Sequence, residues 1–381
     1  MKLSGNIILA FIFFTALLSQ AFAQQSIKAN IIHNQLQRNF SFYVPASYIK
    51  GTAVPLVFNL HGYSSNAEQQ EFYGDFRKIA DTAGFIIVHP NGTVFPQTGF
   101  QFWNVGLVGN SNVDDVGFIH AIIDTLSKAY SIDENRIYST GMSNGGFMSY
   151  HLACLSDRFA AIASVTGSMT ALTQVLCKNA RPMPIMEIHG TADAVVNYNG
   201  SSGILSIPEV LNFWIQKNGL DANAVIKMNV PDLNTGDGSN AEHFYYPGSY
   251  EVEHYKVING GHTWPGTPFV IGTTCQDFNA SEVIWNFFNK HNKQTVNTRE
   301  TTQMEVSVSP NPANEYIWIG LKDNVKRPVS VVIRNLYGQI IFEHQIVDDP
   351  FYMDIRSIPS GVCLIQCFNG YESFYSSFIK I

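Results

Sequence analysis

A serine between two glycines is the first residue whose setting could support catalysis. Residues 141–145 read Gly-Met-Ser-Asn-Gly, between a predicted strand (136–140) and a predicted helix (147–155). A sharp strand-to-helix turn holds such a serine hydroxyl above a sheet, and only residues without a Cβ fit at the two flanking positions. The helix N-terminus behind the serine favours developing negative charge. The motif therefore predicts Ser143 as a nucleophile.

Two later residues, Asp193 and His262, are placed to activate this serine. A serine hydroxyl is a poor nucleophile until a histidine takes its proton and a carboxylate orients that histidine. Asp193 follows the apolar run 185–188, and His262 follows the next predicted strand, 251–257. Serine, acid and histidine, in this order and each after a strand, predict a catalytic triad.

Other acids and histidines in the same region occupy positions that favour structural roles. Three carboxylates either precede a predicted helix or lie inside a buried-looking strand: Asp114, Asp115 and Glu187. Three histidines each follow an apolar strand: His61, His89 and His189. We expect the first two carboxylates to cap the helix and the histidines to form hydrogen bonds with neighbouring loops.

An oxyanion site and a substrate pocket are the remaining parts that this chemistry requires. A tetrahedral intermediate needs two N–H donors aimed at its oxyanion. We expect one from the backbone of Asn144 and the other from Tyr63, in the loop after an early strand. Trp103 and Trp264 are candidates for an acyl or aryl pocket, and burial in the core is the alternative interpretation.

Residues 24–293 alternate short apolar runs with longer helix-like segments. From Val116 to Tyr130 the apolar residues recur at the spacing of one helix face, and residues 281–288 predict a final amphipathic helix. Strands that alternate with helices predict an α/β protein, with a mainly parallel sheet and helices on both faces.

The pattern of apolar and polar residues changes after residue 293. Residues 294–304 are polar and lack apolar periodicity, which predicts a linker. Only short strand-like runs separated by Pro- and Gly-containing turns follow over 305–381, which predicts a small all-β sandwich. A carbohydrate-binding sandwich would need an exposed aromatic row, and Trp318, Tyr352 and Tyr371 are too scattered along the sequence to predict one.

Residues 1–23 have the pattern of a secretory signal peptide. Lys2 precedes an apolar run over residues 7–18, and Ala21 and Ala23 stand at the −3 and −1 positions of a cleavage site. A transmembrane anchor is the alternative, but the run is shorter than the roughly 20 residues that span a bilayer. We therefore expect an exported protein with no membrane-spanning segment after cleavage.

The composition excludes several classes of protein. The 381 residues contain 23 basic and 30 acidic side chains, 45% hydrophobic residues and 13% aromatic residues. This apolar content argues against a disordered chain. A net charge of −7, without a basic cluster, argues against a nucleic-acid partner, because binding to phosphates needs basic side chains in number.

Five cysteines are present, and export would allow disulfides to persist. Cys154 and Cys177 could form a bridge that stabilises the fold by about 3 kcal/mol. Cys363 and Cys367 lie four residues apart in one strand-like run, a separation of about 13 Å, so we do not expect them to pair. No cysteine or histidine pair has ligand spacing, so we expect no metal.

Several motifs of the first region together resemble a known esterase family. They are residues 60–62 (Leu-His-Gly), 113–118 (Val-Asp-Asp-Val-Gly-Phe), 141–148, 189–193 (His-Gly-Thr-Ala-Asp) and 260–264 (Gly-Gly-His-Thr-Trp). They look like the secreted polyhydroxybutyrate depolymerase-like proteins and family 1 feruloyl/acetylxylan esterases. The resemblance covers residues 28–291 and implies an α/β-hydrolase fold, hydrolysis of carboxylic esters, no cofactor, and Ser143, Asp193 and His262 as the triad.

The last region resembles a type IX secretion sorting domain. The motifs are residues 308–313, 335–338, 358–362 and the terminal 379–381, with Cys363 where an aromatic residue is common. The resemblance implies secretion machinery as a partner, passage across an outer membrane, and release or attachment at the cell surface.

We therefore predict a secreted serine ester hydrolase. Feruloyl or acetyl esters of plant polysaccharides are the favoured substrates, because no polyester-binding module accompanies the catalytic region. A polyhydroxybutyrate depolymerase is the alternative, and a serine peptidase or a non-catalytic binding protein with the same fold is more distant.

Overall fold

The computed structural model describes residues 25–107, 111–293, 307–320, 329–335, 340–346, 351–368 and 373–381. The signal peptide predicted over 1–23, the linker predicted over 294–304 and Tyr371 lie outside the described residues. The chain divides into two compact units, Met1–Gln294 and Thr295–Ile381. Within the described residues, no helix has both the length and the apolar character needed to cross a membrane.

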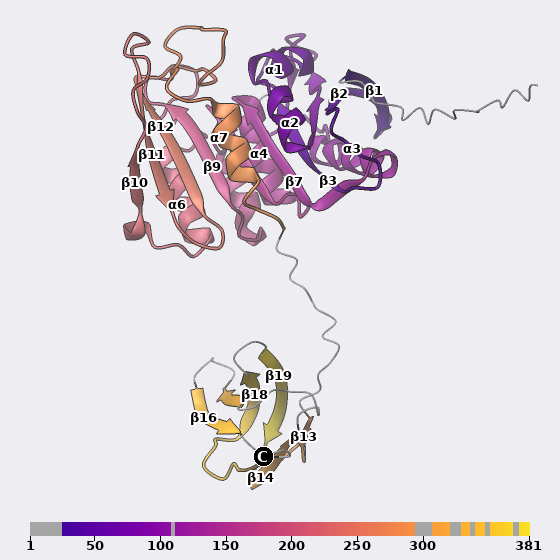
Figure 1. Cartoon of the computed structure of the whole chain (residues 1–381), viewed down its shortest axis with the longest axis vertical. Helices are drawn as coiled ribbons and strands as arrows, with labels where there is room; N and C mark the ends of the chain where they lie inside the picture. The colour runs from indigo at the N-terminus through magenta and orange to yellow at the C-terminus, as the bar shows by residue number, and fades with distance from the viewer. Residues whose placement is uncertain are drawn as a thin grey trace, which may run out of the picture. The chain divides into compact units, whose positions relative to one another are not determined.

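A ten-stranded sheet forms the first unit (Figure 1). Its strands, in spatial order, are β1 (Gln25–His33), β2 (Leu36–Val44), β4 (Ile86–Pro90), β3 (Val54–Leu60), β7 (Ile132–Met142), β8 (Ala161–Val165), β9 (Ile185–Gly190), β12 (Val252–Ile258), β11 (Asn240–Tyr246) and β10 (Ile226–Asn229). The strands from β4 to β12 in this order run parallel, and both edges are antiparallel. Strands β3, β4, β8 and β9 are buried throughout, as their continuous apolar runs require.

Helices cover both faces of this sheet, as predicted (Figure 1). They are α1 (Ala67–Tyr73), α2 (Arg77–Ala83), α3 (Asp115–Ala129), α4 (Asn144–Leu155), α5 (Ala171–Leu176), α6 (Ile207–Lys217) and α7 (Ala280–Phe288). One core packs α3, α4 and α6 against inward residues such as Phe58, and the other packs α2 and α7 against neighbours such as Val57. Shorter elements are β5 (Thr93–Val94), β6 (Gln101–Phe102) and two 3₁₀ turns, Cys177–Asn179 and Ala222–Ala224. The prediction of a mainly parallel α/β sheet is confirmed.

The two acids before α3 have different roles. Asp114 is the N-cap, and its side chain accepts a hydrogen bond of 2.8 Å from the backbone N–H of Gly117. Asp115 is buried inside the first turn, where its carboxylate pairs with Arg38 at 2.7 Å. The capping prediction is therefore right for Asp114 and wrong for Asp115, because a buried cation already neutralises Asp115.

The second unit contains two antiparallel sheets. One consists of β13 (Ser307–Ser309), β14 (Tyr316–Gly320) and β17 (Phe351–Asp354), and the other of β16 (Ile340–Ile346), β15 (Val329–Arg334), β18 (Gly361–Phe368) and β19 (Ser373–Lys380). Apolar residues of both sheets, such as Ile317 and Val331, share one core. The all-β prediction is confirmed.

Three aromatic side chains lie together on the outer face of the smaller sheet. Residues of β14 alternate between exposed and buried, which leaves Tyr316 and Trp318 on the outside. The ring of Tyr352 on the paired strand β17 lies 5.6 Å from the Tyr316 ring and 5.1 Å from the Trp318 ring, between centroids. The expectation that Trp318 and Tyr352 are too scattered to form a row is wrong, because strand pairing joins residues far apart in sequence.

Cysteine pairing follows the sequence prediction. Cys154, in α4, forms a disulfide with Cys177, at the start of the first 3₁₀ turn. Cys363 and Cys367 are both free and buried on β18. The bridge therefore ties the helix that begins at Ser143 to a later segment of the same unit.

Four histidines are buried without charge in the first unit. Burial lowers the pKa of His61 and His151 to about 4 and that of His89 and His254 to about 3. His61 does bond to neighbouring loops, since its Nδ1 lies 2.7 Å from Gly62 O and its Nε2 accepts from Gly92 N at 2.9 Å. The same expectation is wrong for His89, whose ring nitrogens form no hydrogen bond with the described residues; the carboxylate of Glu71 in α1 lies 3.7 Å from its Nδ1.

Removing the disulfide should destabilise the first unit. Replacing both Cys154 and Cys177 by Ala should lower the free energy of unfolding by about 3 kcal/mol, because the unfolded chain regains the entropy of an open loop. Urea unfolding without reductant measures this difference, and Cys275→Ala, at a buried free thiol of the same unit, is the control for lost packing. An unchanged unfolding midpoint in the double variant would show that the bridge contributes nothing.

The buried neutral histidines should make the first unit sensitive to acid. In the unfolded chain each titrates near 6.5, so between about pH 6.5 and 4 the unfolded state binds protons that the folded state excludes. The contribution of these histidines to the free energy of unfolding is therefore complete above about pH 6.5. Below that pH it decreases by up to about 1.4 kcal/mol per pH unit for each histidine. Urea unfolding at pH 7, 6 and 5 tests this, with His89→Gln expected to reduce the slope. A free energy of unfolding that stays constant over this range would contradict the assignment.

Candidate active site

The turn at Ser143 joins β7 to α4 in a constrained backbone conformation. Ser143 has φ 54° and ψ −120°, and its N–H donates to Val165 O at 2.8 Å. A Cβ at Gly145 would lie 2.1 Å from Leu60 O, and one at Gly141 would lie 2.5 Å from the same oxygen. The prediction that only glycine fits at both positions is confirmed. The positive φ is a strain of the kind that recurs at catalytic nucleophiles.

Asp193 and His262 are brought together by the loops after neighbouring parallel strands. β9 pairs with β12, and the loops beyond them are joined by a 3.0 Å hydrogen bond from Ala192 N to Gly260 O. His262 Nδ1 lies 2.7 Å from Asp193 Oδ2. The Asp193 side chain is fully buried, whereas that of His262 is 18% exposed. Nδ1 of the imidazole therefore contacts the acid, which leaves Nε2 to contact other groups.

The second oxygen of Asp193 is also fixed. Asp193 Oδ1 accepts from the backbone N–H groups of Val195 and Val196 at 2.8 and 2.9 Å. Burial works to raise the pKa of Asp193, but the hydrogen bond and charge of His262 and these backbone donors hold it below its usual value. The acid is therefore a carboxylate with a defined orientation.

Two backbone N–H groups lie close to the Ser143 turn. Asn144 is the first residue of α4, so its N–H has no acceptor within the helix. The loop after β3 passes beside the serine, since a Cβ at Gly62 would lie 3.4 Å from the Ser143 Cβ. Among the described residues, no acceptor takes the backbone N–H of Tyr63. Both predicted oxyanion donors thus lie next to the serine turn with N–H groups to offer.

The two tryptophans named for a substrate pocket are core residues. Trp103 is fully buried, and the Asn144 side chain holds its backbone at two points, with Oδ1 2.6 Å from Trp103 N and Nδ2 3.2 Å from Trp103 O. Trp264 is 1% exposed, and its Nε1 donates to Ser281 Oγ at 3.2 Å. The expectation of an open aromatic pocket wall is therefore revised. The Asn144–Trp103 clamp could not be found from sequence spacing, because it joins the start of α4 to the segment after β6.

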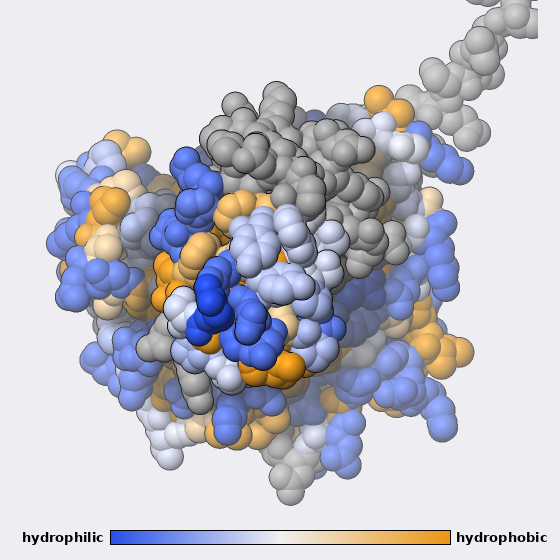
Figure 2. Space-filling model, turned by 90° about the horizontal axis from the view of Figure 1, so that it is seen from below, coloured by the Kyte–Doolittle hydropathy of each residue, from blue (hydrophilic) through white to orange (hydrophobic). Residues whose placement is uncertain are grey.

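Exposed apolar side chains lie beside the loop that carries His262. The ring of Phe269 in this loop packs against that of Phe72 in α1, with centroids 4.2 Å apart and planes tilted by 32°. Both rings are exposed, as are Val270 and Ile271. On the face drawn in Figure 2, hydrophobic residues are mostly interspersed with hydrophilic ones.

A hollow of about 580 Å³ lies at the edge of the sheet, next to the loop that carries Tyr63. Ser64 and Ser65 of this loop line it, and Phe100 contributes an apolar wall. Six further lining side chains are neutral and polar: Asn30, Asn39, Ser41, Asn66, Asn91 and Gln101. Lys28 and Glu68 add one charge of each sign, so the hollow offers hydrogen-bonding groups to a polar molecule.

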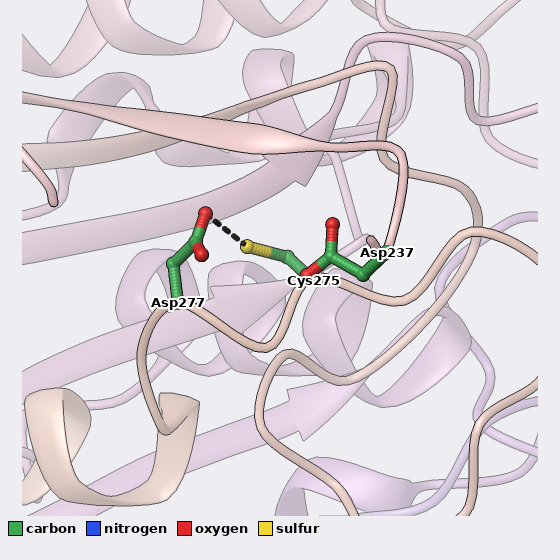
Figure 3. A group of neighbouring side chains, drawn as sticks. All are labelled: Asp237, Cys275 and Asp277. Atoms are coloured by element: carbon green, nitrogen blue, oxygen red, sulfur yellow. Dashed lines mark hydrogen bonds between the residues drawn. The ribbon is translucent and has the colours of Figure 1, made fainter. Parts of the chain in front are cut away.

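One cluster of side chains has atoms close enough to hold a metal ion (Figure 3). It consists of Asp237, Cys275 and Asp277, with ligand atoms all within 4.8 Å of one another. The Cys275 thiol donates to Asp277 at 3.5 Å, and burial raises its pKa to about 11. Backbone N–H groups of Ser239 and Gln276 bond to Asp237, and those of Leu233 and Asn234 bond to Asp277. A protonated thiol between satisfied carboxylates ties two loops together and does not suit a cation.

Known proteins resemble this chain in both units. Residues 75–183 match the prolyl oligopeptidase family, and residues 307–380 match the secretion system C-terminal sorting domain. A bifunctional acetylxylan esterase/xylanase of Neocallimastix patriciarum is 31% identical over 169 residues, which are 44% of this chain and 23% of that protein. Feruloyl esterase B of Piromyces equi is 33% identical over 57% of this chain and 41% of its own length.

A third relative matches over most of its length. A probable feruloyl esterase C of Aspergillus niger is 27% identical over 269 residues, which are 68% of this chain and 87% of that protein. The chain spans less than half of the length of the first two relatives. The first unit is thus similar to feruloyl and acetylxylan esterases, and residues 307–380 match a secretion sorting domain.

Proposed function

We propose that the protein is a secreted serine carboxylic-ester hydrolase in which Ser143 is the nucleophile, His262 the base and Asp193 the orienting acid. The observation that carries the proposal is the 2.7 Å contact between His262 Nδ1 and Asp193 Oδ2, which follow strands of the same sheet as the strand before Ser143. A buried carboxylate on Nδ1 fixes the imidazole tautomer, so that Nε2 takes the serine proton.

The reaction proceeds in two halves. His262 Nε2 takes the proton of Ser143 as Oγ forms a bond to the ester carbonyl carbon. The tetrahedral intermediate collapses, the bond to the alcohol oxygen breaks, and His262 returns the proton to the leaving alcohol. Water then attacks the acyl-enzyme by the same route, and the carboxylic acid leaves with Ser143 restored.

Two backbone donors stabilise the charge that develops on the carbonyl oxygen. The N–H groups of Asn144 and Tyr63 flank the serine turn and are not taken by other acceptors among the described residues. Removal of one oxyanion donor typically costs a factor of 10²–10³ in kcat. The Asn144 side chain, clamped on Trp103, keeps the first donor in place.

We propose feruloyl or acetyl esters of plant polysaccharides as the substrate class. The related proteins named feruloyl esterase and acetylxylan esterase support this choice. The hollow beside Ser64 and Ser65 supports it too, because neutral amides and hydroxyls suit sugar hydroxyl groups. The exposed rings of Phe72 and Phe269 are candidates to contact an apolar acyl group. The C-terminal unit supports export through a dedicated secretion system, with that machinery as a partner.

A polyhydroxybutyrate depolymerase is the second candidate, because the exposed apolar side chains near His262 would also suit a polyester. A serine peptidase is a more distant candidate, and the match of residues 75–183 to the prolyl oligopeptidase family is what favours it. The three candidates differ in the bond that is cleaved and in the polymer that is attacked.

Substrate panels separate these candidates. The purified protein should hydrolyse p-nitrophenyl acetate and methyl ferulate, leave peptide substrates intact, and release ferulate or acetate from xylan in preference to hydroxybutyrate from polyhydroxybutyrate. Ser143→Ala should lower kcat by at least about 10³-fold, because the acyl-enzyme cannot form. Chromatography of the released products gives the rates.

Ser139→Ala is the matched control, because Ser139 is a buried serine on β7, the strand that leads to Ser143, and its hydroxyl bonds to that of Ser149. The control should retain activity. Ester turnover that survives Ser143→Ala, or that is absent from the wild type, would refute the proposal. Preferential release of hydroxybutyrate would instead select the depolymerase.

A further inference from the structure

A second histidine lies buried directly behind the proposed acid. His189, at the end of β9, is completely buried. Its Nδ1 lies 2.9 Å from Glu187 Oε1 and its Nε2 lies 2.8 Å from Val196 O. The same Nε2 is 3.5 Å from Asp193 Oδ2, the oxygen that contacts His262. The proposed mechanism leaves Glu187 and His189 without a role.

The partners of His189 define its protonation. A neutral imidazole has one N–H and one lone pair, so it donates from only one nitrogen. A carbonyl oxygen faces one nitrogen of His189 and a carboxylate faces the other, and both are acceptors. The Tyr150 hydroxyl donates to the other oxygen of Glu187 at 2.7 Å, which stabilises the carboxylate. An imidazolium that donates from both nitrogens, one of them to a Glu187 carboxylate, satisfies both contacts.

His254, on the neighbouring strand β12, provides the contrast. It is also buried, and its Nδ1 lies 2.9 Å from the backbone oxygen of Glu187. Its Nε2 faces the Tyr198 hydroxyl at 3.0 Å, which can donate, so a neutral ring satisfies both contacts. Burial lowers the pKa of His254 to about 3. Burial also works against His189, but the hydrogen bond and charge of Glu187 outweigh it and raise the pKa of His189.

We propose that His189, held as an imidazolium by Glu187, is a positioning residue that fixes Asp193 from behind and keeps His262 unprotonated to lower pH. The inference rests on the proposed function. Val196 completes the arrangement, because its N–H bonds to Asp193 and its C=O bonds to His189. A positive charge beside Asp193 opposes a second positive charge on His262, so His262 remains available as the base in more acidic solution.

Few other ionisable groups surround His189. Glu187 on β9 and Asp193 in the loop after β9 face the ring, and the ring of Tyr198 from the same loop lies beside it. Tyr150 on α4 contacts Glu187, and His254 lies on the neighbouring strand β12. Lys256 lies beyond, over the Tyr198 ring at 5.7 Å. Because His254 is neutral and the tyrosines are protonated, Glu187 and Asp193 are the charges that set the state of His189.

The full-length Glu187→Gln variant tests the proposal. Gln keeps the shape of the side chain but removes the charge that holds the imidazolium. The acidic limb of the kcat/KM profile, which reports protonation of the base, should move to higher pH by about half a unit to one unit. The value of kcat on the alkaline plateau should change by less than about threefold, because all groups that contact the substrate remain. Both quantities are measured with p-nitrophenyl acetate between pH 4.5 and 9.

The sheet offers a matched control. Glu253 on β12 is also buried and also paired with a histidine, His243, at 2.8 Å, but it does not contact Asp193. Glu253→Gln should leave the acidic limb where it is in the wild type. A limb that stays unmoved in Glu187→Gln, or that moves equally in both variants, would overturn the proposal.

The wild-type protein provides a readout that does not depend on variant folding. In ¹⁵N spectra of histidine-labelled protein at pH 7.5, His189 should have both ring nitrogens protonated, and His254 should have one ring nitrogen protonated. A lone-pair nitrogen on His189 would contradict the imidazolium. If the wild type does not hydrolyse esters, both the proposed function and the role of His189 in its pH dependence are refuted. If the wild type has a normal pH profile and the acidic limb of Glu187→Gln is unmoved, only the role of His189 is refuted.

Discussion

The parallel pairing of β9 with β12 is the interaction on which the candidate site depends. Hydrogen bonds between these strands bring the loops after both to the same edge of the sheet. The backbone bond from Ala192 to Gly260 then joins the loops, and close packing of Gly190 against Gly260 leaves no room for a side chain. The contact between Asp193 and His262 follows from this pairing, although the two residues are far apart in sequence. A buried carboxylate would be costly without the imidazole and the two backbone donors that meet it.

The serine turn depends on a second close approach. Gly141 and Gly145 let the turn pass against Leu60, so the first residues of α4 and the loop with Gly62 and Tyr63 lie together. Asn144 adds its clamp on the Trp103 backbone from the other side. Two loops and a helix N-terminus therefore converge where negative charge would develop during ester hydrolysis.

Features that depend on short stretches of sequence could be predicted. Alternating apolar runs predicted the mainly parallel sheet, and the short strand-like runs after residue 305 predicted the all-β unit. The requirement for glycine at 141 and 145 followed from the turn alone. The buried state of Trp103 and the ion pair of Asp115 with Arg38 depend on segments that meet only in the folded chain. The aromatic row of Tyr316, Trp318 and Tyr352 needed the register between β14 and β17, which no local pattern supplies.

Labelling with a fluorophosphonate probe tests the central claim most directly. Such a probe forms a covalent bond only with a serine that a neighbouring base has activated. The proposed triad predicts one label per chain, located by mass spectrometry on Ser143, with labelling slowed strongly by His262→Ala. A label on another residue, or ester hydrolysis that continues after Ser143 is fully labelled, would contradict the account.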